Sequence, residues 1–81
     1  MSPDELAPIF RRRPYLPVRL HLTEGEVIDV PNPEMALVGR TVLLLGVQRD
    51  TASPYFDEPV MLALAHIRKV EPIVASIPQP T

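Results

Sequence analysis

The chain contains 81 residues with no cysteine, and its formal net charge is -2. This length suits one small domain with a thin hydrophobic core, and the lack of cysteine excludes disulfides and cysteine-based zinc sites. A charge so near zero gives no electrostatic argument for binding nucleic acid or an anionic membrane. Association with copies of itself or with a protein partner is therefore the most accessible way to supplement the core.

No apolar run approaches the roughly 20 residues that a membrane-spanning helix needs. The first residues, MSPDE, lack the basic region and apolar run of a signal peptide. We therefore expect a cytoplasmic protein without a membrane partner. Most of the 11 prolines mark where regular structure stops, because proline is disfavoured in helix interiors and central strands; Pro8 falls inside the first predicted helix, which is therefore either kinked or begins later.

A short helix is predicted over residues 3–12. Ser2, Pro3 and Glu5 match a hydroxyl N-cap, a proline in the first turn and a capping-box glutamate. Apolar side chains follow at helical spacing, and Pro14 disfavours helical geometry at the residue before it.

A β-hairpin is predicted next. Residues 18–23 and 26–30 alternate apolar and polar side chains, and Gly25 between them can take the positive φ of a tight turn. Prolines at both ends of residues 31–33 stop the second strand. Residues 33–38 are expected to form a single helical turn that ends at a glycine.

The strand around which the fold is predicted to be arranged is TVLLLGVQ, residues 41–48. Because strand side chains alternate between faces, Val42 and Leu44 share one face, which we assign to the core. The other face is a predicted interface, covered by a subunit, the long loop or the helix. Its residues are Leu43, Leu45 and Val47. Gly46 is expected to be a bend in a curved sheet.

A loop is predicted over residues 49–59, with the aromatic pair Tyr55 and Phe56 at its tip. Exposed aromatic side chains in a loop either anchor a partner or fold back as a lid over the core, and both interpretations stay open here.

Two further strands are expected, at residues 60–64 and from residue 67 or 68 to residue 71, with a tight helical turn between them. Residues 1–73 then form a single domain, and residues 74–81 are an extended, proline-containing tail.

Most of the chain resembles a family of short bacterial proteins of uncharacterised function. The resemblance lies in an amphipathic N-terminal helix followed by RRPYLPVRLHLTEGEVIDVPNPE, VGRTVLLLGV and LALAHIRKVEP. These segments share proline stops, a hairpin glycine and alternating aliphatic residues. The resemblance implies no activity.

The order of the elements is more distantly similar to that of Sm-like proteins, in which a helix precedes a strongly bent five-stranded barrel. LAHIRKVEP stands in the place of their closing turn and last strand. This resemblance implies assembly into rings that bind RNA. The chain departs from it where Pro31-Asn32-Pro33 replaces an Asp-x-Asn triplet and Ala65-His66 replaces a Lys-His pair, so uridine recognition is not carried over.

A basic cluster beside an aromatic residue is the candidate nucleic-acid site. Arginines bind phosphates, and an aromatic ring stacks on a base. Alternatively, the arginines complement the negative end of the helix and face solvent, and eight basic residues in all are few for strong binding. The candidate residues are Arg11, Arg12, Arg13, Tyr15 and Arg19.

The two histidines, His21 and His66, are candidates for a metal or acid–base site, with Asp29 across the hairpin from His21. A metal site needs three or four converging ligands, and acid–base chemistry needs a pocket. Exposed strand and turn positions are the simpler interpretation, and no nucleophile motif or phosphate-binding glycine loop is present. We therefore expect no enzyme activity, cofactor, metal or small-molecule substrate.

The predicted fold is mainly β: a small, strongly bent antiparallel five-stranded barrel of the Sm-like kind, with a short N-terminal α-helix. The predicted function is a non-enzymatic, self-associating scaffold or interaction module that forms a ring or another homo-oligomer. An RNA-binding protein that uses residues 11–13 is the alternative, and a metal or hydrolytic site at the histidines is a third. The predicted core is Leu6, Ile9, Phe10, Val18, Leu20, Leu22, Ile28, Val30, Leu37, Val42, Leu44, Leu62, Leu64, Ile67 and Val70.

Overall fold

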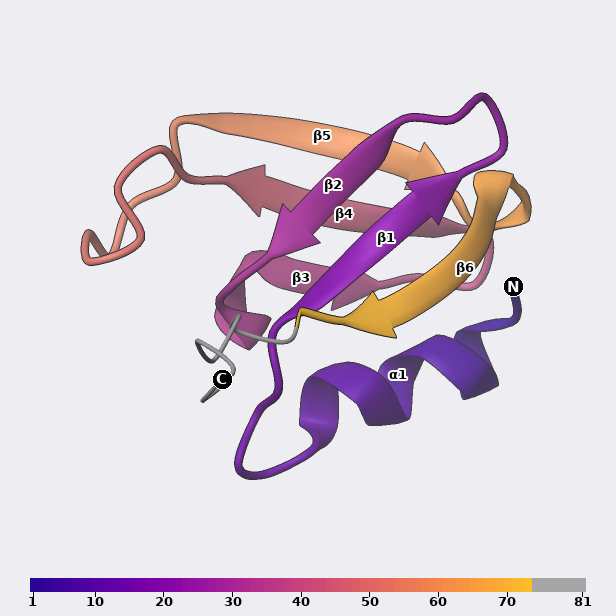
Figure 1. Cartoon of the computed structure of the whole chain (residues 1–81), viewed down its shortest axis with the longest axis horizontal. Coiled ribbons are helices and arrows are strands. Elements are labelled where there is room, and N and C mark those ends of the chain that lie inside the picture. The colour runs from indigo at the N-terminus through magenta and orange to yellow at the C-terminus, as the bar shows by residue number, and fades with distance from the viewer. Residues whose placement is uncertain (74–81) are drawn as a thin grey trace, which may run out of the picture.

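The computed structural model describes residues 1–73, and the predicted tail at residues 74–81 lies outside the described residues. Within residues 1–73, the chain forms one α-helix and six strands (Figure 1). These elements are α1 (Pro3–Arg11), β1 (Val18–Leu22), β2 (Val27–Val30), β3 (Ala36–Val38), β4 (Val42–Val47), β5 (Glu58–Ala63) and β6 (Ile67–Pro72). Two 3₁₀ helices join them: η1 (Pro33–Met35) before β3, and η2 (Leu64–His66) between β5 and β6.

The strands form two antiparallel sheets, ordered β2-β1-β6 and β3-β4-β5. Figure 1 shows one sheet in front of the other, with α1 along one side. The mainly β prediction is confirmed, but the five-stranded barrel is wrong, because the described residues form six strands in two sheets that do not close into a barrel. In the described part of the chain, no helix is both long and apolar enough to cross a membrane.

The strand that we did not predict is β3, which lies in a segment where we expected a helical turn. The turn is limited to η1, because the next three residues pair with β4, from Ala36 opposite Leu45 to Val38 opposite Leu43. Prolines at both ends of residues 31–33 lack the backbone donor that would let β2 continue into β3 as one ladder. The chain therefore leaves one sheet and enters the other.

The helix and the hairpin follow the predicted local signals. The Ser2 hydroxyl accepts a hydrogen bond from the Glu5 backbone N–H at 3.2 Å, and the Ser2 backbone N–H donates to the Glu5 carboxylate, which completes the capping box. Gly25 has a φ of 93° in the turn between β1 and β2. Both predictions are confirmed. Such features can be predicted from sequence because each depends on residues that are close together in the chain.

The core lies between the sheets and α1. Its buried members are Leu6, Phe10, Val18, Leu20, Leu22, Val30, Leu43, Leu45, Leu64 and Ile67. Leu37 and Leu44, which we predicted to be buried, are 67% and 38% exposed. The two faces of β4 are thus reversed relative to the prediction, because a strand that is apolar on both sides carries no signal for which side points inward.

Candidate interaction surface

Three large apolar side chains lie directly opposite one another across the sheet β3-β4-β5. Leu37 pairs with Leu44, and Leu44 pairs with Met61. Their exposed fractions are 67%, 38% and 66%. We call Leu37, Leu44 and Met61 the apolar row. It crosses all three strands on the side of the sheet that faces away from the core.

The rest of this outer face is also uncharged. Since Leu43 and Leu45 point into the core, their neighbours in β4 point outward, and the pairing register extends this alternation to β5. Apart from the apolar row, the outward positions are Val42, Gly46, Pro59 and Ala63. The outer face of β3-β4-β5 therefore has no charged side chain within its strands.

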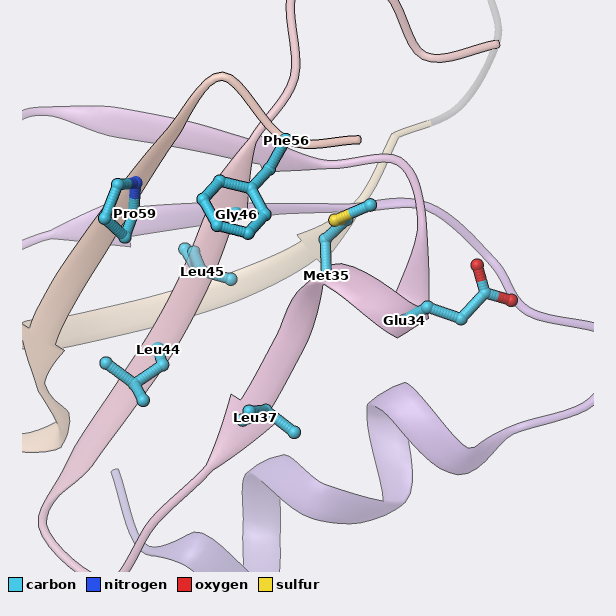
Figure 2. A pocket seen from close by; sticks show the side chains of 8 residues that line it. All are labelled: Glu34, Met35, Leu37, Leu44, Leu45, Gly46, Phe56 and Pro59. Atoms are coloured by element: carbon cyan, nitrogen blue, oxygen red, sulfur yellow. The ribbon is translucent and has the colours of Figure 1, made fainter. Parts of the chain in front are cut away.

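Phe56 covers one end of this outer face. A Cβ atom placed on Gly46 would lie 2.7 Å from the Phe56 Cβ and 3.1 Å from the Met35 Sδ, so the ring occupies space that only glycine leaves free. Figure 2 shows the ring over Gly46, with Leu44 and Leu37 beside each other further along the sheet. An open depression of about 230 Å³ lies among these side chains.

The loop that carries Phe56 is tied to the sheet by hydrogen bonds. The Gln48 side chain donates to the Ser53 carbonyl at 2.7 Å, and the Asn32 side chain donates to Gln48. The Asp57 backbone N–H donates to the Val47 carbonyl at 2.8 Å. Phe56 is thus held against the sheet and is still 54% exposed, whereas Tyr55 is 78% exposed.

The outer face of the other sheet has the opposite character. Arg19 makes a two-pronged ion pair with Asp29, at 2.7 and 3.1 Å. Glu71 accepts a hydrogen bond from the His21 Nε2 at 2.5 Å and lies 3.5 Å from the Lys69 amine. The hydrogen bonds from Arg19 and His21 lower the pKa of Asp29 and of Glu71, respectively. The charged side chains of this face form ion pairs with one another and remain exposed to water.

The histidines do not form the predicted pair with Asp29. The β1–β2 register places Asp29 opposite Arg19 and places Val27 opposite His21. His66 is exposed in η2. Within residues 1–73, no group of three or more side chains is arranged to bind a metal ion.

The candidate nucleic-acid residues are divided among several local roles. Arg13 donates to the Phe10 carbonyl at 3.0 Å and so satisfies the end of α1. The Tyr15 hydroxyl donates to the Val30 carbonyl at 2.7 Å, and burial raises the pKa of Tyr15 to about 12. Its ring stacks on Phe10 with centroids 6.3 Å apart, which leaves it turned toward the core.

Arg19 is held by Asp29 on the sheet β2-β1-β6, while Arg11 and Arg12 are exposed at the end of α1. The structure therefore does not gather the five candidates into one site. Nucleic-acid binding at this cluster stays a prediction.

Of the predicted interface residues, Leu43 and Leu45 are in the core, and Val47 is half-buried on the inward side of β4. The surface that remains uncovered is the opposite face. Sequence reasoning missed Leu37, because its strand was taken for a helical turn, and it did not single out Met61. For Met61 the available signal was alternation, since it lies between the inward residues Val60 and Leu62.

Comparisons of this chain with protein-family models, curated proteins and solved structures found no match. The proposals that follow are therefore argued from the geometry and chemistry of the chain itself.

Proposed function

We propose that this protein is a non-enzymatic, self-associating interaction module, and that it docks a second copy through the outer face of β3-β4-β5. The observation that carries the proposal is the apolar row, in which three exposed large side chains stand in register across three strands. Removing such surface from water contributes about 25 cal/mol per Å². The outer face of the other sheet carries ion pairs that are stable in contact with water, so covering it would not gain comparable free energy.

A second copy is the occupant that fits this face best. The strands present no charged side chain there, so two copies in face-to-face contact bury apolar surface on both sides and desolvate no charge within the strands. A small domain without disulfides also gains stability from such contact.

The size of the face predicts a weak, reversible dimer. Three strands of six residues or fewer span a projected area of roughly 300 Å². Stable interfaces bury about 800 Å² per partner, so even with Phe56 and Met35 at its edge the face falls in the weak class. We expect a dissociation constant on the order of micromolar to hundreds of micromolar.

The test is sedimentation equilibrium or native mass spectrometry over a concentration series. The wild-type chain should shift from monomer to dimer as its concentration rises, and Met61→Asp should remain monomeric, because a buried, unpaired carboxylate opposes docking. Val27→Asp is the matched control, because Val27 is 51% exposed in β2 on the outer face of the other sheet. It should dimerise like the wild type.

A wild-type chain that stays monomeric up to millimolar concentration would refute the proposal. Equal loss of dimer in both variants would also count against it, because the effect would then not depend on this face. Circular dichroism establishes that each variant is folded.

A further inference from the structure

We infer that the two copies dock in an antiparallel, two-fold arrangement in which Glu34 of each copy faces Arg40 of the other. The inference rests on the proposed self-association through the outer face of β3-β4-β5. It adds the orientation of the partner and the residues that determine it.

Glu34 and Arg40 lie three residues on either side of Leu37, the β3 member of the apolar row. Glu34 is in η1, at the end of the sheet where β3 begins, and Figure 2 shows its carboxylate directed away from the apolar side chains. Arg40 follows Gly39 in the turn that joins β3 to β4. One acidic and one basic side chain therefore stand at opposite ends of the same strand.

Both side chains are exposed, and neither forms an ion pair within the part of the chain that the structure describes. This separates them from the charges on the other sheet, where Arg19, Asp29 and Glu71 all have partners. Glu34 also lines the depression beside Leu37 and Leu44, so it borders the proposed contact.

Two face-to-face dimers with a two-fold axis are possible, and they differ in which charged side chains meet across the interface. If the axis runs along the apolar row, β3 of one copy lies over β3 of the other in the opposite direction. Since Leu37 is on the axis, Glu34 then meets Arg40 twice, because a two-fold interface repeats every contact. An acidic group meets a basic group at both ends of β3.

If the axis instead runs along the strands, β3 lies over β5 of the second copy with the strand directions preserved. Glu34 then lies over the start of β5 of the second copy and far from Arg40, because β3 and β5 run in the same direction beside β4. This arrangement brings no unlike charges together, whereas the first pairs Glu34 with Arg40 twice, so the charges favour the first.

The two charge contacts set the orientation more than the affinity. Exposed ion pairs contribute little individually, and salt screens them, so the apolar row supplies most of the attraction. Dimerisation of the wild type should therefore weaken only moderately, by roughly threefold to tenfold, when the salt concentration rises from low to high.

The experiment is a charge-reversal cycle measured by sedimentation equilibrium at low salt. Glu34→Arg and Arg40→Glu should each weaken the dimer roughly tenfold, because each replaces two attractive contacts with two repulsive ones. The double variant Glu34→Arg/Arg40→Glu should recover wild-type affinity to within about threefold. Arg68→Glu, at an exposed position in β6, is the control for the change in net charge.

The outcomes separate this inference from the proposal beneath it. Suppose that the wild type dimerises and Met61→Asp does not, but that the double variant loses as much dimer affinity as the two single variants combined. Self-association then stands, and the pairing of Glu34 with Arg40 is wrong. If Arg68→Glu weakens the dimer as much as Arg40→Glu, net charge explains the effect and the pairing is again wrong. If the wild type never dimerises, both proposals fail.

Discussion

Gly46 shows how one residue shapes the outer face of β3-β4-β5. Its role does not come from an unusual backbone angle, because in residues 1–73 the only positive φ belongs to Gly25. Gly46 is needed because Phe56 and Met35 occupy the space where a side chain would be. The glycine that we expected to be a bend in a barrel is a point of close approach between the loop and the sheet.

Gly46→Ala should therefore lower the free energy of unfolding by about 1 to 3 kcal/mol, the usual cost of forcing an extra carbon into a packed site. The new Cβ would be 2.7 Å from the Phe56 Cβ and 3.0 Å from its Cγ, so the loop must move. Urea denaturation measures the loss. An alanine variant as stable as the wild type would show that the loop can move away from the sheet at no cost in stability.

At the scale of the elements, the two sheets differ in what they present outward. β4 is apolar on both sides, so its sheet has one buried and one uncovered apolar face. β1 alternates cleanly, so its sheet has a buried face and a charged face. The charged face places Arg19 beside Asp29 and His21 beside Glu71, with β1 in the middle.

These ion pairs predict how stability depends on acid. Since the pKa values of Asp29 and Glu71 are lower in the folded chain than their ordinary values of 3.8 and 4.5, both carboxylates stabilise the fold above those values. The contribution is lost as the pH falls through the lowered pKa values. Thermal unfolding between pH 6 and pH 2 should thus show a falling melting temperature below about pH 4.5.

Asp29→Asn and Glu71→Gln are the matched variants for this acid dependence, because an amide keeps the shape of the side chain but is neutral and does not titrate. Each should flatten the decline at low pH, and the double variant should flatten it most. The effect should be small, since both carboxylates are partly exposed and water screens them. A slope identical to that of the wild type would contradict the assignment of these two groups.

At the scale of the whole molecule, α1 completes the core. Leu6 is fully buried and Phe10 nearly so, and both pack with the residues that the two sheets contribute. With so short a chain, the core is thin, and the removal of one well-packed side chain takes a large share of the total stability.

Leu6→Ala should therefore cost about 2 to 5 kcal/mol, enough to leave much of the protein unfolded at 37 °C. Leu16→Ala is the control, because Leu16 is 39% exposed in the connector before β1 and should change stability little. Urea denaturation of both variants tests this. Equal stabilities would mean that α1 packs only loosely on the sheets.

Local chemistry predicted the elements that short-range signals specify. The Ser2 cap and Glu5 specify the start of α1, and Gly25 specifies the hairpin turn. The strands on either side of that turn alternate, so their inward residues were also predictable. Residues 36–38 were not, because an isolated segment of three residues is too short to show its period, and pairing with β4 decides its conformation.

The sequence by itself determined a mainly β chain, a capped helix and most of the core, since these follow from spacing, caps and turns. Only the tertiary structure decided which side of β4 faces the core, because both sides are apolar and the choice depends on what packs against Leu43 and Leu45. The same choice left Leu44 uncovered between Leu37 and Met61. The surface on which our proposals rest therefore arises from packing between sheets, which no single segment encodes.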